Sequence, residues 1–152
     1  MHRISVSVLN VVGLILLLSS SNTFGQCDRK TDSLELVKIY NSTVGYNWSS
    51  PWPLYKPINQ WQGVHLNIDG CVDSLELIVQ NLGDPLPDLS FPELKYFEVT
   101  HNEHEGPVPQ LECPKLKYLE LELCSLVGKI PDYQNLKELE FLSLLDNHIE
   151  GP

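Results

Sequence analysis

The chain has 152 residues, enough for one ordinary domain. Hydrophobic residues make up 42% of it and charged residues 20%, so the composition permits a buried core and does not indicate disorder. Its 20 acidic residues outnumber its 10 basic residues, which gives a net charge of -10. That charge argues against nucleic acid and against an anionic membrane surface as partners, because both attract lysine and arginine.

The first 25 residues have the layout of a secretory signal peptide. A basic residue precedes an apolar run from Ile4 to Leu18, and small polar residues follow up to Gly25. The run is shorter than a bilayer span, which needs about 20 apolar residues. We therefore expect removal of residues 1–25, secretion or display at the cell surface, and no stable membrane insertion afterwards. A lipid anchor on Cys27 is the alternative, which the bulky Gln26 before it disfavours.

Residues 72–152 consist of a repeat whose copies begin at residues 72, 94, 116 and 139, with spacings of 22, 22 and 23. The common pattern is L-x-x-L-x-L-x-x-N-x-L-x-G-x-I-P. A single copy cannot bury its apolar residues, whereas stacked copies form one continuous core. This segment carries five lysines against 16 acidic residues, so it holds all of the excess negative charge.

The pattern resembles the plant-type leucine-rich repeat, whose distinguishing half reads His104-Glu-Gly-Pro-Val-Pro and Leu126-Val-Gly-Lys-Ile-Pro here. The resemblance implies an α/β leucine-rich-repeat solenoid with a curved parallel sheet on its concave side and short irregular or 3-10 segments on its convex side. In this family an asparagine after each strand bonds backbone groups inside the turn. Gln80 and Cys124 occupy that position in two copies, so we expect a less regular hydrogen-bond ladder there.

Residues 26–71 are interpreted as an N-terminal cap, because the end of a solenoid otherwise exposes its core. Asp32 followed by Glu35 predicts a helix start that leads to about Asn41. Asp69-Gly70 predicts a tight turn in a β-hairpin whose second strand is the first repeat strand. The segment is similar to the cap that precedes such repeats in secreted bacterial proteins. The predicted apolar face of the helix comprises Leu34, Leu36, Val37, Ile39 and Tyr40.

Three tryptophans lie close together in the cap, at Trp48, Trp52 and Trp61. Flat aromatic rings can stack on sugars, so these residues could form a carbohydrate platform. Burial at the end of the solenoid explains all three equally well, and we favour that interpretation.

Four cysteines in a secreted chain suggest disulfide bonding. Cys27 and Cys71 both lie in the cap, and we expect them to pair. Cys113 and Cys124 bracket one repeat strand, and a strand of that length should hold their Cα atoms beyond bridging distance. We expect both to be free and buried, with a reactive thiol at Cys124 as the alternative.

The repeat pattern assigns the concave face, because alternate residues of a strand point to opposite sides of the sheet. It predicts an aromatic column beside a glutamate column, in which like charges repel across neighbouring strands. The glutamates could select a basic protein patch, a cationic ligand or a calcium ion, and the face as a whole could bind a protein or a glycan. It could also be a solvated face whose repulsion Lys95 and Lys117 soften. The predicted ligand-binding residues are Tyr96, Tyr118, Phe141, Glu76, Glu98, Glu120, Thr100 and Glu122.

Metal binding and catalysis have little support in the sequence. His101 and His104 form an H-x-x-H string, but His104 stands at a core leucine position, so we expect it to be buried and hydrogen-bonded. No enzyme motif is present, and we expect no catalytic residue, metal or cofactor.

These patterns predict a secreted, non-catalytic module that binds a protein or a glycan on its concave face. The alternative is an N-terminal targeting or scaffold segment of a larger secreted enzyme or adhesin. The sequence stops within a repeat at Pro152, so we expect a fragment or the first part of a longer protein.

Overall fold

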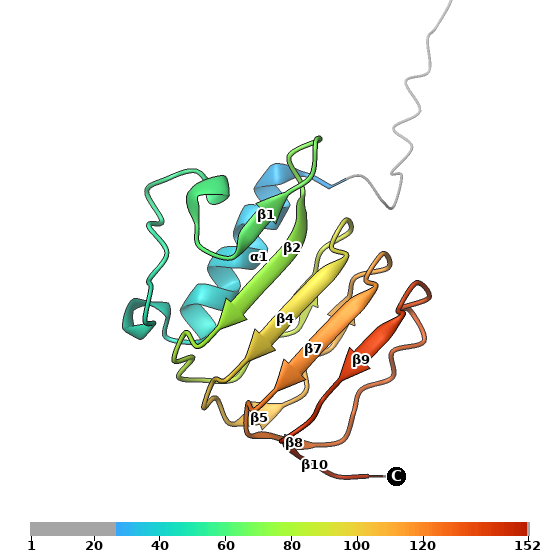
Figure 1. Ribbon diagram of the computed structural model, residues 1–152. Helices are drawn as coiled ribbons and strands as arrows, with labels where there is room; N and C mark the ends of the chain where they lie inside the picture. The colour runs from blue at the N-terminus through green and yellow to red at the C-terminus, as the bar shows by residue number, and fades with distance from the viewer. Residues whose placement is uncertain (1–26, 152) are drawn as a thin grey trace, which may run out of the picture.

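The computed structural model describes residues 27–151, so the predicted signal peptide lies outside the described residues. A helix at the N-terminal end is followed by a row of strands that lie side by side along the molecule (Figure 1). Within this described part of the chain, no helix is both long and apolar enough to cross a membrane.

Helix α1 (Arg29–Ser42) begins earlier than the sequence pattern predicts. Its N-cap is Asp28, whose carboxylate accepts a hydrogen bond from the Lys30 backbone N–H at 3.0 Å. The prediction of Asp32 as the N-cap is therefore wrong. Asp32 is buried inside the first turn, where its Oδ2 accepts a hydrogen bond from the Val72 backbone N–H at 2.8 Å. This bond ties the helix to the first repeat strand.

The buried face of α1 is narrower than predicted. Leu36 and Ile39 are fully buried, and Val37 and Tyr40 pack against the core. Leu34 is exposed to solvent, which contradicts its assignment to the apolar face. The helix ends at Ser42, one residue beyond the predicted end.

The three cap tryptophans form a buried cluster. Trp48 and Trp52 have ring centroids 4.8 Å apart, and Trp52 stacks on Trp61 at 5.0 Å. Each indole N–H donates to a backbone carbonyl, of Thr43, Gln62 and Lys56 respectively. All three rings are at most 5% exposed, so they close the end of the core and cannot serve as a sugar platform.

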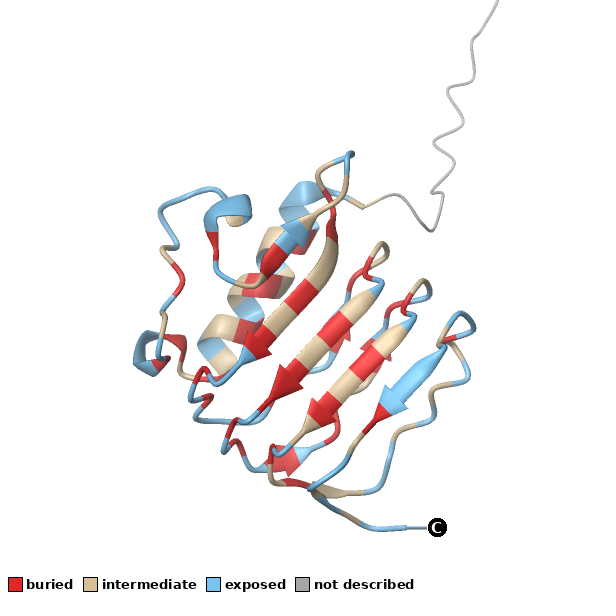
Figure 2. Cartoon of the chain, in the orientation of Figure 1, coloured by how far each residue is buried: buried red, intermediate tan, exposed pale blue. Residues whose placement is uncertain are grey.

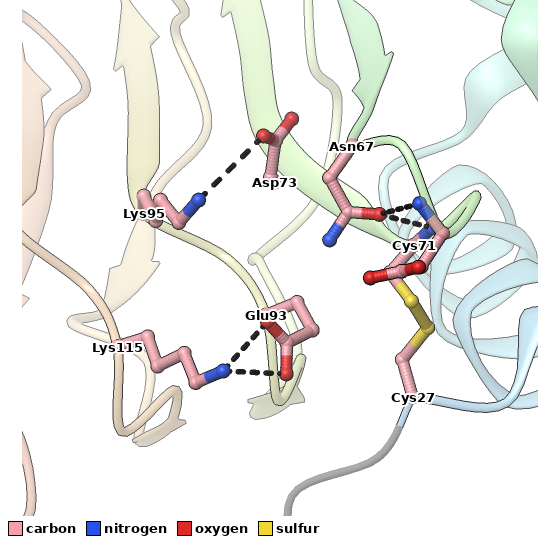
Figure 3. A network of polar contacts seen from close by, with 8 residues as sticks. Cys27, Asn67, Cys71, Asp73, Glu93, Lys95 and Lys115 are labelled. Carbon is pink, nitrogen blue, oxygen red and sulfur yellow. Dashed lines mark hydrogen bonds and ion pairs between the residues drawn. A yellow bond between two sulfur atoms is a disulfide. The ribbon is translucent and has the colours of Figure 1, made fainter.

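A β-hairpin joins the cap to the repeats. Strand β1 (Val64–Leu66) pairs antiparallel with β2 (Val72–Ile78), and the Gly70 N–H donates to the Asn67 carbonyl at 3.0 Å in the turn between them. Gly70 has a φ of 82°, which glycine adopts without strain. The predicted disulfide between Cys27 and Cys71 is present and joins the residue before the N-cap of α1 to the residue before β2 (Figure 3).

The repeat strands form one parallel sheet beyond the hairpin. Strands β4 (Tyr96–Thr100), β7 (Tyr118–Glu122) and β9 (Phe141–Ser143) follow β2, in the order β1-β2-β4-β7-β9. Each residue pairs with its counterpart one repeat later. Buried and partly exposed residues alternate along β4 and β7 (Figure 2), as expected when one side of each strand lines the core.

The convex side consists of irregular segments and very short strands. Strands β3 (Leu89–Ser90) and β6 (Leu111–Glu112) form one pair. Strands β5 (Gly106–Pro107), β8 (Leu126–Gly128) and β10 (His148–Ile149) form another small sheet. The described 3-10 helices, η1 (Gly45–Asn47) and η2 (Ile58–Gln60), both lie in the cap. The residues predicted for the convex wall of the core are buried, namely Phe91, Cys113 and Leu136.

A recurring turn follows each of the four repeat strands. It begins with a residue in the left-handed region, at Val79, His101, Leu123 and Asp146. The next residue turns its side chain inward. Asn102 accepts hydrogen bonds from the backbone N–H groups of Gln80 and Leu82, and it donates to the carbonyls of Leu77 and Thr100. Asn147 bonds the turn of the repeat before it, at Cys124 and Leu126, in the same way.

Gln80 replaces the asparagine in the first repeat and bonds toward the cap. Its Oε1 accepts from the Ser50 N–H at 3.2 Å, and its Nε2 donates to the Ile78 carbonyl at 3.2 Å. The longer side chain of glutamine thus links the first repeat to the cap.

Candidate functional site

The third position of each repeat strand forms a column across the concave face. Ser74, Tyr96, Tyr118 and Phe141 are direct partners in the parallel register. The rings of Tyr96 and Tyr118 stack with centroids 4.4 Å apart and planes 9° apart, and those of Tyr118 and Phe141 stack at 4.4 Å and 8°. We call these three stacked side chains the aromatic ladder.

The aromatic ladder follows from the register of the sheet. Parallel strands lie about 4.8 Å apart, which is close to the contact distance of two stacked rings. Aromatic residues at the same position of successive repeats therefore hold their rings face to face. Tyr96 and Tyr118 are partly exposed and Phe141 is 42% exposed, so the ladder presents aromatic surface to solvent.

A glutamate column runs beside the aromatic ladder, at Glu76, Glu98 and Glu120. The Tyr96 hydroxyl donates to Glu98 at 2.6 Å, and the Tyr118 hydroxyl donates to Glu120. Each tyrosine thus donates a hydrogen bond to the carboxylate two residues further along its own strand. These charge-assisted hydrogen bonds hold the carboxylates in place and offset part of their mutual repulsion.

Lys95 and Lys117 do not neutralise this column, contrary to the alternative raised from the sequence. Lys95 pairs with Asp73 at 4.0 Å (Figure 3), and Lys117 pairs with Glu140 at 3.1 Å. Both pairs lie between second positions of adjacent repeats, at the start of the strands. Neither lysine therefore pairs with a glutamate of the column.

The tyrosine hydroxyls are held in their neutral form. Burial, followed by the hydrogen bond to Glu98 and its charge, raises the pKa of Tyr96. The hydrogen bond to Glu120 is the main cause that raises the pKa of Tyr118. Both hydroxyls therefore remain hydrogen-bond donors well above neutral pH.

The residues at the seventh position of the repeats differ in how far they are exposed. Thr100 is only 4% exposed, so it offers little surface to a ligand. Glu122 is partly exposed and accepts a hydrogen bond from the Ser143 hydroxyl on the next strand. Ile78 and Leu145 occupy the same position in the first and last repeats and are both exposed.

His65 is a member of this face that the repeat pattern does not reveal. It lies on β1 opposite Ser74, and its Nε2 is 3.5 Å from Glu76 Oε1. The hairpin, not the repeat, brings it there. The antiparallel register across the predicted Asp69-Gly70 turn is the signal in the sequence that could have placed His65 on this face.

One concavity lies in the cap. It has a volume of about 570 Å³ and lies between α1, η2 and the hairpin, where Arg29, Lys56 and Ile58 line it. Smaller depressions of about 380 and 350 Å³ share His101 and Glu103 at the ends of the strands. The concave face extends over the adjacent strands of the main sheet, and an extended face of this kind suits a macromolecular partner.

The two histidines of the H-x-x-H string are not brought together as ligands. His104 is fully buried, whereas His101 is exposed. The prediction that His104 is hydrogen-bonded is wrong, since neither ring nitrogen has a partner. Burial without a partner lowers the pKa of His104 to about 4 and keeps its ring neutral.

The four cysteines have structural roles. Cys113 and Cys124 are free and buried, as predicted. Burial raises the pKa of the Cys113 thiol to about 12 and that of Cys124 to about 11, so neither forms a thiolate readily. Cys27, Asp32 and Cys71 lie close enough to share a cation, but the two sulfurs are bonded to each other.

Solved structures share this fold. The leucine-rich-repeat ectodomain of the receptor kinase SOBIR1 from Arabidopsis thaliana superimposes with a TM-score of 0.55 at 20% identity, over 78% of this chain and 68% of that one. The crystal structure of PEPR1-AtPEP1 superimposes with a TM-score of 0.59 at 21% identity, over 80% of this chain and 19% of that one. The chain therefore spans about a fifth of the length of the second structure.

The sequence comparisons add no relative. No protein-family model matches the chain, and no curated protein matches it. The structural likeness and the topology together establish a leucine-rich-repeat solenoid with a parallel sheet.

Proposed function

We propose that this protein is an extracellular binding module that holds a protein partner on its concave face. The observation that carries the proposal is the aromatic ladder, whose three rings are aligned in one exposed column. Tyrosine is enriched among the residues that dominate protein interfaces. The ladder is also rigid before binding, so little side-chain entropy is lost on association.

The core does not depend on this face. The inward residues of β4 and β7, such as Phe97 and Leu119, are fully buried, while the ladder residues stand on the opposite side of the strands. Selection can therefore vary the concave side chains without loss of the solenoid. The likeness to a receptor-kinase ectodomain supports an extracellular setting, as does the predicted signal peptide.

The proposal is tested by affinity capture with matched variants. The purified protein serves as bait in extracellular fluid of its source, and retained proteins are identified by mass spectrometry. Tyr96→Ala with Tyr118→Ala should weaken capture of a specific partner by at least about tenfold. The control pair is Tyr46→Ala with Tyr55→Ala, because both are highly exposed tyrosines in the cap.

The outcome of this comparison decides the proposal. A partner that the wild type and the cap variant retain, and the ladder variant loses, supports it. A partner that the ladder variant retains as well as the wild type does overturns it. Circular dichroism and urea unfolding establish that both double variants remain folded.

A further inference from the structure

The aromatic ladder has an open end at Ser74. Ser74 is the partner of Tyr96 in the sheet and occupies the same third position as the three aromatic residues. Its hydroxymethyl group is too small to cover the neighbouring ring. Tyr118 covers one face of Tyr96, so the opposite face looks over Ser74 toward β1 (Figure 1 shows the order of these strands).

The space above Ser74 has walls on two sides. Tyr96 lies on one side, and His65, which pairs with Ser74 from β1, lies on the other. These two residues stand two strand spacings apart, roughly 9.6 Å. Since adjacent rings of the ladder are 4.4 Å apart, this gap is wide enough for one additional planar group.

Two carboxylates border the same space. Glu76 and Glu98 lie two residues along from Ser74 and Tyr96 and are partners in the register. Glu98 is oriented by the Tyr96 hydroxyl at 2.6 Å, and Glu76 lies 3.4 Å from the Ser74 hydroxyl. The nearest lysine along the chain, Lys95, pairs with Asp73 instead.

The other end of the ladder lacks this combination. Ser143 occupies the fifth position of the strand that carries Phe141, whereas the three preceding repeat strands carry glutamate there. An exposed aromatic face and a pair of carboxylates therefore coincide at the Ser74 end.

We propose that the space above Ser74 is a subsite for an arginine side chain of the protein partner, whose guanidinium stacks on Tyr96 and pairs with Glu76 and Glu98. The inference rests on the proposed function and specifies the partner's chemistry. A guanidinium is planar, stacks on aromatic rings and presents several N–H donors to carboxylates. A lysine ammonium supplies the charge but neither the flat shape nor the forked donors.

The direct test uses N-acetyl-arginine amide as the probe, titrated at low ionic strength and followed by backbone NMR. Shifts should centre on Ser74, Glu76, Tyr96 and Glu98. The matched probe N-acetyl-citrulline amide keeps the shape without the charge and should bind at least about tenfold more weakly, as should the lysine analogue.

Variants test whether the probe binds at the Ser74 end of the ladder. Ser74→Phe fills the space with the protein's own ring and should abolish probe binding, and phenylalanine suits an outward strand position. Tyr96→Leu should weaken binding by about tenfold. Tyr55→Leu removes a highly exposed ring of the cap and should leave probe binding unchanged.

Several results would overturn the subsite. These are equal binding of the arginine and citrulline probes, wild-type affinity in Ser74→Phe, or shifts that do not cluster around Ser74. Its failure is distinguishable from failure of the proposed function. A captured partner that requires Tyr96 and Tyr118 but tolerates Ser74→Phe keeps the binding face and removes only the arginine subsite.

Discussion

Cys124 makes with its thiol the same two backbone contacts that Asn102 makes with its side-chain amide one repeat earlier. The Cys124 Sγ lies 3.2 Å from the Val99 carbonyl and 3.0 Å from the Glu122 carbonyl. The Asn102 Nδ2 lies 2.7 Å from the Leu77 carbonyl and 2.9 Å from the Thr100 carbonyl. The thiol therefore preserves the donor half of the asparagine ladder, although sulfur is the weaker donor.

This relationship predicts unequal costs for two alanine substitutions. Asn102→Ala removes two donated and two accepted hydrogen bonds and leaves buried backbone groups unpaired, so it should cost about 2–4 kcal/mol of unfolding free energy. Cys124→Ala removes only the two weak thiol contacts and should cost about 1–2 kcal/mol, including the small cavity. Urea unfolding of both variants measures the difference. Equal costs would show that the thiol does not replace the amide.

His104 predicts a pH-dependent loss of stability. Its pKa is lowered from 6.5 to about 4 in the folded protein, so the unfolded chain binds the proton more readily. The stability is fully present above pH 6.5 and falls as the pH decreases toward 4. The loss due to this residue approaches about 3 kcal/mol at the lower limit.

His104→Leu should remove that pH dependence. Leucine is the residue that the repeat pattern specifies there, and it eliminates two unpaired buried nitrogens. The variant should be more stable than the wild type at pH 5 and should show a flatter stability profile between pH 6.5 and 4. His148→Gln, at an exposed histidine of β10, is the matched control. An unchanged profile in His104→Leu would contradict the assignment.

Tyr96 should resist ionisation in alkaline solution. Burial is the main cause that raises its pKa, and the hydrogen bond to Glu98 adds to it. Its contribution to stability is present below pH 10 and is lost as the pH rises through the folded value. Glu98→Gln should move the Tyr96 pKa part of the way back toward 10, as measured by phenolate absorbance. A pKa that stays the same would mean that the carboxylate has no influence on the ring.

The disulfide between Cys27 and Cys71 should stabilise the cap. It closes a loop across a sequence separation of 44 residues, so its removal by Cys27→Ser with Cys71→Ser should cost about 2–4 kcal/mol. Cys113→Ser is not a suitable control, because that thiol is buried in the core. Chemical reduction of the wild type should instead reproduce the loss seen in the double variant, and a reduced protein of unchanged stability would contradict the prediction.

Periodicity explains which parts of the structure could be predicted. The spacing of 22 or 23 residues fixes the register of Tyr96, Tyr118 and Phe141, because equal positions on stacked repeats become partners in the sheet. The same spacing places Phe91 and Cys113 on the convex wall of the core. A repeat thus converts sequence distance directly into spatial proximity.

Contacts that occur only once in the structure could not be predicted from the spacing of the repeats. Asp32 has the local pattern of a helix cap, but its carboxylate bonds Val72, which is 40 residues away in the sequence. His65 reaches Glu76 through the hairpin. The tyrosine–glutamate hydrogen bonds depend on the rotamers of both side chains, which the strand pattern leaves undetermined.

The order of strands in the main sheet also bears on how the chain acquires its structure. Each repeat strand of the main sheet pairs with the repeat strand before it, from β2 through β4 and β7 to β9. The tryptophan cluster and α1 lie at the end of this series that is synthesised first. Each new repeat strand of the main sheet can therefore dock onto a repeat strand that already exists as the chain emerges.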